Sequence, residues 1–306
     1  MLTDEDFAMR NRINAACATL LLGILGAAGC ANSGGTPSEP VLPRPFGGVL
    51  AYGQHERQAL HTANERLIAD CMRRRGHVYE PEGLATGRPD PEDGNPYWLL
   101  TTEQARQDGY GITSARLNTR MPRDPNKARS GEREWREALL GTTAHRVHVR
   151  LPGKQEFFYN ADACLTKARD TLYGADYERL YNTYQVLAMQ VVSAVHKDSR
   201  YLKAQRRWSG CMRDAGVRAG TLDDPRSSVD RRLRRAAADR GGLRAVARHE
   251  LKLSRQDASC QRKTGLARTV TEAQKRAEKA VAGDRRPALV RLRTLRDAAV
   301  RRATGT

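Results

Sequence analysis

One short pattern occurs twice in this chain and limits how the chain can fold. The segment CMRRRG begins at Cys71 and the segment CMRDAG begins at Cys211, so both follow Cys-Met-Arg-x-x-Gly. Each copy closes an amphipathic helical pattern, and a glycine five residues after the cysteine suits the left-handed conformation that ends many helices. The sequence therefore predicts two related helical modules, each with a cysteine close to a helix end.

The N-terminal segment has the three parts of a secretory signal peptide. A basic segment, 10–12, precedes the apolar stretch 15–25, and small residues stand directly before Cys30. The apolar stretch is shorter than the roughly 20 residues that a transmembrane helix needs. We therefore predict a signal peptide over residues 1–29. Acidic residues near the first methionine do not suit such a segment, so we expect translation to start at Met9.

Small residues before Cys30 resemble the lipobox of bacterial lipoproteins, in which the cysteine is lipidated and becomes the new N-terminus. Ala27 occupies a position that is usually Leu in that motif. Residues 30–51 then form a predicted tether, rich in Gly, Ser and Pro and without apolar periodicity. The expected location is the outer face of the cytoplasmic membrane, with a palmitate-type lipid anchor. Two alternatives stay open: cleavage after Gly29 without a lipid, and a buried N-terminal helix with an incidental cysteine.

Four cysteines remain once Cys17 has left with the signal peptide and Cys30 has been lipidated. An even number of cysteines in an exported chain favours two disulfides, and four cysteines allow three pairings. The repeat gives each module one Cys-Met cysteine and one later helical cysteine that follows closely after an aspartate. We therefore predict the disulfides Cys71–Cys164 and Cys211–Cys260.

A zinc site and a reactive thiol are the alternatives for Cys211. Structural zinc sites usually contain close pairs such as C-x2-C, and no two cysteines of this chain are so close. A nucleophilic thiol needs a neighbouring base and has to stay reduced outside the cytoplasm. His145 and His148 are three residues apart on a predicted strand, which places them on opposite faces. We therefore favour disulfides and expect no metal site.

Hydrophobic periodicity predicts a mostly α-helical bundle with one small β-hairpin. The hairpin is expected near 145–159, where residue types alternate around a Pro-Gly turn. Asp176 is expected to cap a long helix, and a later basic helix is expected to start near Asp223 and to end at 241–242. The predicted parts after the tether are a first disulfide module (52–174), a second disulfide module (175–282) and a basic C-terminal helix (283–306).

Positive charge is concentrated in the last third of the chain. Residues 200–306 contain 29 Lys and Arg and 11 Asp and Glu, whereas residues 30–199 contain 22 and 21. This asymmetry indicates an anionic partner, and an exported chain would meet anionic phospholipid or cell-wall polymer rather than nucleic acid. A solvated Arg-rich face is the alternative. The candidate binding residues are Arg231, Arg232, Arg234, Arg235, Arg291 and Arg293.

Several segments together resemble a family of secreted lipoproteins of actinobacteria. They are the W-x-x-C-M-x-x-x-G segment 208–216, the D-x-x-C-x-x-x-T-x-L segment 257–266, the earlier C-M-x-x-x-G at 71–76 and the G-Y-G at 109–111. The likeness covers most of residues 52–282. It implies a helical, disulfide-bridged, exported lipoprotein and no particular chemistry, because the family carries no assigned activity.

Common catalytic motifs are missing from the sequence. There is no G-x-S-x-G, no P-loop and no G-x-G-x-x-G. We therefore predict no catalytic residue and no cofactor, and a binding or structural role at the cell envelope. The first alternative is an accessory subunit of an envelope transporter or sensor, within a membrane protein complex. The less favoured alternative is an envelope hydrolase, in which His77, Tyr79 or Asp257 would join a polar cluster in a pocket.

Overall fold

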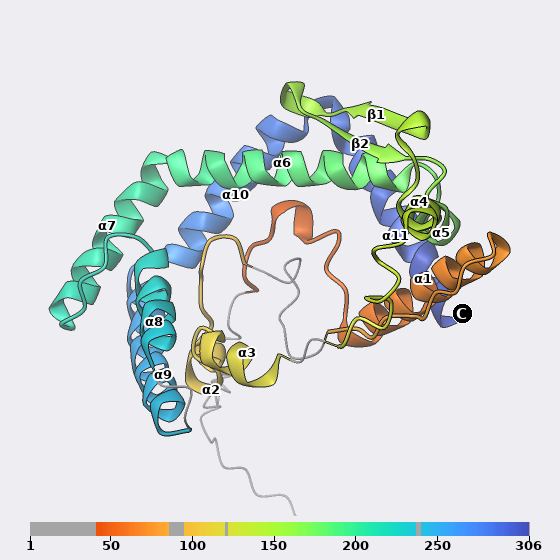
Figure 1. Cartoon of the computed structure of the whole chain (residues 1–306). Coiled ribbons are helices and arrows are strands. Elements are labelled where there is room, and N and C mark those ends of the chain that lie inside the picture. The colour runs from red at the N-terminus through yellow and green to blue at the C-terminus, as the bar shows by residue number, and fades with distance from the viewer. Residues whose placement is uncertain (1–40, 86–94, 120–121, 237–239, 306) are drawn as a thin grey trace, which may run out of the picture. The chain divides into compact units, whose positions relative to one another are not determined.

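A computed structural model describes residues 41–85, 95–119, 122–236 and 240–305 of the chain. The described part is mostly helical with one antiparallel hairpin, as the sequence predicts (Figure 1). The predicted signal peptide, Cys30 and the first ten residues after it lie outside the described residues. The helices are α1 (Gln54–Arg74), α2 (Thr102–Gln107), α3 (Ile112–Asn118), α4 (Arg133–Leu140), α5 (Cys164–Tyr173), α6 (Tyr177–Lys197), α7 (Ser199–Asp214), α8 (Asp223–Arg235), α9 (Arg240–Lys263), α10 (Leu266–Ala282) and α11 (Arg286–Thr304), and the strands are β1 (Arg146–Arg150) and β2 (Glu156–Asn160).

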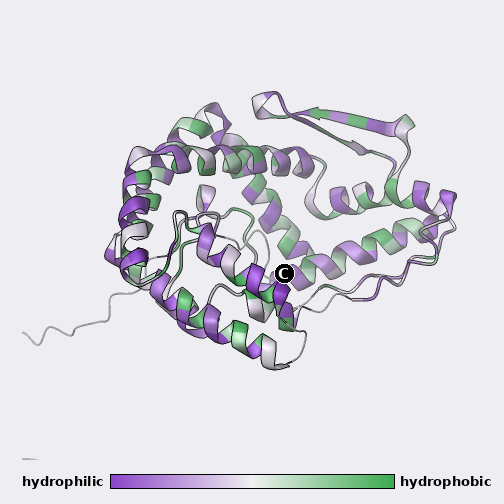
Figure 2. Ribbon diagram, turned by 60° about the vertical axis from the view of Figure 1, so that its left-hand side comes forward, coloured by the Kyte–Doolittle hydropathy of each residue, from purple (hydrophilic) through white to green (hydrophobic). Residues whose placement is uncertain are grey.

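Helix α6 carries a long buried stripe that joins the two halves of the fold. Leu187, Val191 and Val195 are fully buried along it, at helical spacing. The helix packs against α7 and α10 and also against α11, and Figure 1 shows it passing from one helical group to the other. Hydrophobic and hydrophilic residues alternate along the helices, as expected of amphipathic segments (Figure 2). The two helical groups, described below, belong to one compact unit, Glu39–Thr306.

The first group consists of α1, α4, α5 and α11. Helix α1 packs against α5 and α11, and Ile68, Met72 and Trp135 form the core beside the first cysteine pair. The C-terminal helix contributes to two further clusters, in which Leu292 and Ala299 are fully buried. The predicted basic C-terminal helix is therefore packed into the fold through its apolar face.

The second group consists of α7, α8, α9 and α10, together with two short helices from earlier in the chain. Trp208 and Met212 of α7 are fully buried in its core. Helices α2 and α3 both pack against α9. The region 102–118, which the predicted division places in the first module, therefore makes its contacts with the second helical group.

Both predicted disulfides are confirmed. Cys71 is bonded to Cys164 and Cys211 to Cys260, with Cα–Cα distances of 5.6 and 5.7 Å. The first bridge links α1 to α5, and the second links α7 to α9. Each bridge thus ties a Cys-Met helix to a helix later in the same group.

The glycines of the two repeats end their helices in the same way. Gly76 and Gly216 have φ angles of +80° and +79°. In each copy the residue after the glycine donates its N–H to the carbonyl of the repeat methionine, Met72 or Met212, which itself is fully buried. This hydrogen-bond pattern is a Schellman motif, which satisfies helix carbonyls that otherwise lack a partner. The prediction that the repeat glycine stops the helix is confirmed.

The hairpin is also confirmed, with Arg146 opposite Asn160 and Arg150 opposite Glu156. Burial alternates along β1 and along β2 as far as Tyr159, so each strand has a half-buried face and an exposed face. Phe157 is half-buried, whereas Phe158 is exposed. The loop between the strands approaches α6.

Three details differ from the sequence-based expectations. The Asp176 side chain makes no capping hydrogen bond and lies 3.3 Å from Arg179 instead. The glycines 241–242 lie in the first turn of α9, because α8 already ends at Arg235. At the start of α7, helical periodicity predicts Leu202 near the face of Trp208 and Met212, but Leu202 is exposed and the preceding Tyr201 is buried instead.

The end of the predicted tether is packed rather than extended. Val49 and Leu50 are buried at 4% and 1% exposure and join a cluster with Tyr184 and Leu292. The backbone N–H of Phe46 donates to the carboxylate of Glu278 over 2.7 Å. Apolar residues close after the Pro-rich stretch therefore belong to the folded unit.

Candidate anion-binding site

Helix α8 carries opposite charges at its two ends. Asp224 lies in its first turn and accepts hydrogen bonds from the backbone N–H groups of Gly220 and Thr221, at 2.7 and 2.8 Å. Burial alone would raise the pKa of Asp224. These hydrogen bonds outweigh burial and hold that pKa below its usual value. The last turn carries arginines, and this order complements the helix dipole. The same arrangement gathers positive charge at the C-terminal end of α8.

The C-terminal end of α8 and the start of α9 enclose a pocket of about 500 Å³. Val246 is buried at 2% exposure and contributes an apolar surface to it. The α8 side chains that line it recur at i, i+3, i+4 and i+7, so they share one helix face. The lining residues are Ser228, Arg231, Arg232, Arg235 and Ala236 from α8, and Gly242, Ala245, Val246 and His249 from α9.

The arginines of this pocket have no acidic neighbours in its lining. Among the described residues, Arg231, Arg232 and Arg235 take part in no ion pair, whereas Arg234 pairs with Asp230 one turn before it. Three like charges around one space repel one another, and an anion bound between them relieves that repulsion. The structure thus brings together three of the six arginines that the sequence predicts as a binding surface.

His249 adds a titratable group to the basic pocket. Burial lowers the pKa of His249, and the positive charges of Arg232 and Lys252 lower it further. The imidazole is therefore held neutral by its surroundings. An anion in the pocket would reverse the second effect and raise the pKa of His249.

Arg291 and Arg293 lie elsewhere. Both are exposed on α11, which packs against α1, α5 and α6, whereas α8 packs against α9 and α3. A third arginine of α11, Arg296, is used internally: its guanidinium lies 4.6 Å from the ring centre of Tyr52. The basic C-terminal third of the chain therefore divides into separate surfaces.

The buried hydrogen-bond partners of Asp257 were not predicted from the sequence, where this residue is a candidate only in the hydrolase alternative. Asp257 is fully buried and accepts hydrogen bonds from Trp208 Nε1 at 2.9 Å, Gln261 Nε2 at 2.8 Å and Tyr110 Oη at 3.0 Å. Burial raises its pKa from 3.8 to about 6, although these three hydrogen bonds oppose the shift. The Trp of the W-x-x-C-M segment and the Asp of the D-x-x-C segment are therefore direct partners.

Glu250, two turns before Asp257 on α9, binds the start of α3. Its carboxylate accepts the backbone N–H groups of Tyr110, Ile112 and Thr113 at 2.8 to 3.0 Å. Gly109 has φ +67°, and a Cβ there would lie 2.8 Å from Glu250 Cγ. The G-Y-G segment is thus the partner of a buried carboxylate, and only glycine fits the approach.

These two carboxylates are structural in their geometry. Their oxygen atoms accept hydrogen bonds, and both side chains are almost completely covered. Tyr79 donates to Glu65 at 2.9 Å and stacks on Trp135 in the first helical group. Tyr79 and Asp257 therefore lie in separate groups of hydrogen-bonded side chains.

Comparison with known proteins adds no relative: no family model, no curated protein and no solved structure matches the chain. Within the described ranges, no helix combines the length and the apolar character needed to cross a bilayer. The basic pocket between α8 and α9 is the candidate site that the geometry itself provides. Guanidinium groups arranged around one space can bind an oxyanion through charge-assisted hydrogen bonds.

Proposed function

We propose that this protein is a lipid-anchored extracytoplasmic lipoprotein, attached through Cys30, that binds phosphate groups of an anionic envelope surface in the pocket between α8 and α9. The observation that carries the proposal is the set of three arginines around one space, without an acidic neighbour in its lining. Guanidinium groups bind phosphate oxygens through charge-assisted hydrogen bonds. Two disulfides suit the oxidising conditions outside the cytoplasm, and the likeness to actinobacterial secreted lipoproteins supports the same location.

A Lys or Arg close to an anionic membrane contributes about 1 kcal/mol to the binding free energy, and salt weakens this electrostatic contribution. For the chain from Ala31 onward, we expect cosedimentation with phosphatidylglycerol vesicles at low salt and much weaker binding to phosphatidylcholine vesicles. Replacing Arg231, Arg232 and Arg235 together by Gln should weaken binding roughly 100-fold. Purified cell wall serves as a second arm, which distinguishes lipid phosphate from wall-polymer phosphate.

A matched control separates the pocket from general positive charge. Arg206, Arg207 and Arg213 are exposed on α7, and replacing them by Gln removes the same charge elsewhere. We expect this control to weaken vesicle binding only a few-fold. Equal losses in both triple variants would show that net charge, not the pocket, determines binding, and would contradict the proposal.

A histidine titration gives an independent measurement. Inorganic phosphate should raise the pKa of His249 in NMR spectra, because it offsets the charge of Arg232. The Arg291→Gln/Arg293→Gln variant should leave this response unchanged and reports whether the α11 surface contributes to vesicle binding. A His249 signal that does not respond to phosphate would count against the pocket as a phosphate site.

A further inference from the structure

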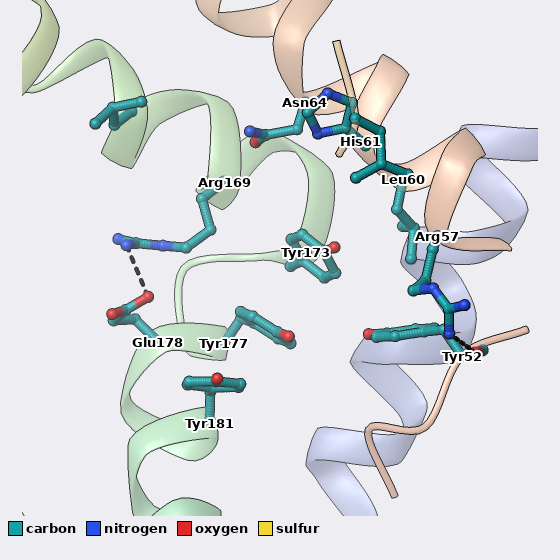
Figure 3. A pocket seen from close by; sticks show the side chains of 12 residues that line it. Tyr52, Arg57, Leu60, His61, Asn64, Arg169, Tyr173, Tyr177, Glu178 and Tyr181 are labelled. Carbon is teal, nitrogen blue, oxygen red and sulfur yellow. Dashed lines mark hydrogen bonds and ion pairs between the residues drawn. The ribbon is translucent and has the colours of Figure 1, made fainter. Parts of the chain in front are cut away.

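A second pocket, of about 490 Å³, lies between α1 on one side and the α5–α6 corner on the other (Figure 3). Three tyrosines form a column along the α5–α6 side. The rings of Tyr173 and Tyr177 are stacked with centres 4.1 Å apart, and Tyr181 follows 5.8 Å from Tyr177. Gly174, with φ +98°, makes the turn that allows this column to continue from α5 into α6.

The opposite side of the tyrosine pocket is mostly polar. Arg57, Leu60, His61 and Asn64 follow one face of α1, and Tyr52 precedes the helix and points across the pocket toward the column (Figure 3). A ligand between the two sides therefore meets aromatic rings on one side and hydrogen-bonding groups on the other.

The guanidinium of Arg169 in this pocket is already paired with a carboxylate. Arg169 Nη1 lies 2.7 Å from the Glu178 carboxylate, and Arg57 Nη1 donates to the backbone carbonyl of Tyr52 at 2.7 Å. The pocket thus differs from the α8–α9 site, whose lining contains no carboxylate. An anion gains little at Arg169, because it would have to compete with Glu178 for the same guanidinium.

A purely apolar ligand is also poorly suited to the tyrosine pocket. The side chain of Asn64 makes no hydrogen bond within the part of the chain that the structure describes. Covering such groups with hydrocarbon costs free energy because their donors and acceptors stay unpaired.

The remaining occupant has an apolar ring face and several uncharged oxygen atoms on its edge. We propose that the tyrosine pocket binds a neutral oligosaccharide. A C–H face of the sugar lies against Tyr181 at the end of the column, and hydroxyl groups bond to Asn64 and to the ring nitrogen of His61 that does not contact the Glu82 carbonyl. A volume near 500 Å³ is in the range of small-molecule sites. This inference concerns a second site and does not depend on phosphate binding between α8 and α9.

The test uses the full-length protein in phosphatidylcholine nanodiscs and three probes: N-acetylglucosamine tetramer, cellotetraose and maltotetraose. We expect calorimetry to detect binding of at least one of them with Kd below about 1 mM. Tyr181→Leu removes a ring face at similar volume and should weaken that binding about 3- to 10-fold. Asn64→Leu should weaken it about fivefold and carries the test alone if Tyr181→Leu does not fold.

Phe158→Leu is the matched control, since Phe158 is an exposed ring on the hairpin outside this pocket. It should leave the affinity unchanged. Absence of binding by all three probes at roughly 10 mM would overturn the proposal. So would affinities unaffected by both pocket variants, competition by inorganic phosphate, or binding of p-cresol without any oligosaccharide. Vesicle binding can fail while sugar binding holds, so the two proposals are tested separately.

Discussion

The two Cys-Met-Arg-x-x-Gly segments have the same backbone conformation, but the aspartates near their partner cysteines differ in environment. Both end a helix with a left-handed glycine, both bury their methionine, and both bond their cysteine to a later helix. The aspartate near the second cysteine of each pair behaves differently. Asp162 keeps part of its side chain exposed, whereas Asp257 is fully buried. A repeated motif therefore specifies the helix end and the crosslink, but not the environment of the neighbouring carboxylate.

Each aspartate has a separate partner that explains its environment. Asp162 precedes α5 and accepts hydrogen bonds from the N–H and hydroxyl of Thr142 at 2.9 to 3.1 Å. Asp257 lies within α9 and is covered by Tyr110 and Trp208. The G-Y-G segment supplies that cover in the second group. The G-Y-G segment comes early in the chain, within the predicted first disulfide module. It nevertheless determines the environment of Asp257 in the second helical group.

The largest test of the comparison removes each disulfide in turn. The bridges close segments of 93 and 49 residues, for which chain entropy predicts a loss of roughly 4–5 kcal/mol in the free energy of unfolding. We expect Cys71→Ala/Cys164→Ala and Cys211→Ala/Cys260→Ala to lose similar amounts in urea unfolding under oxidising conditions. A difference above roughly 2 kcal/mol would mean that packing around one bridge, not chain entropy, dominates its effect.

The second test uses pH to separate the two aspartates. The pKa of Asp257 is raised by burial to about 6, so its contribution to stability is complete below about pH 4 and is lost as the pH rises through 6. At Asp162, burial would raise the pKa, but the hydrogen bonds from Thr142 outweigh it and the pKa is lowered. Its contribution is therefore present above about pH 4 and is lost as the pH falls through the lowered value.

Unfolding free energies of Asp257→Asn and Asp162→Asn between pH 3 and 7 measure these effects. Asn at 257 can still accept from Trp208 and Gln261 and donate to Tyr110, so the fold should persist. Relative to wild type, Asp257→Asn should gain roughly 3 kcal/mol on going from pH 4 to pH 7. Relative to wild type, Asp162→Asn should lose stability as the pH rises through the lowered pKa of Asp162. Changes of the same sign in both variants would contradict the assignment.

The sequence predicts much of the fold because helical periodicity and the repeat are local signals. The stripe of α6, the hairpin and the helix-ending glycines all follow from residues close together in the chain. The two disulfides also follow, because the repeat itself pairs each Cys-Met cysteine with a later partner. Local chemistry of this kind is preserved whatever the tertiary packing.

The candidate sites depend on distant segments, and only part of them could be predicted. The arginines of α8 were identified from charge, but their separation from Arg291 and Arg293 follows from helix packing. The pairing of Glu250 with 109–113 joins residues about 140 positions apart. No periodicity signals such a contact, although the glycines on either side of Tyr110 mark an unusual backbone. The tyrosine pocket likewise joins α1 to α6.

The smallest test compares glycines that share a left-handed backbone but differ in space. A Cβ at Gly76 or Gly216 meets no heavy atom within 4 Å, whereas at Gly109 it lies 2.8 Å from Glu250 Cγ. We expect Gly76→Ala and Gly216→Ala each to cost roughly 1 kcal/mol from backbone strain alone, and Gly109→Ala to cost roughly 2 kcal/mol because Glu250 must also move. Equal losses at all three positions in urea unfolding would show that the buried carboxylate yields without cost. The G-Y-G segment would then be only a turn.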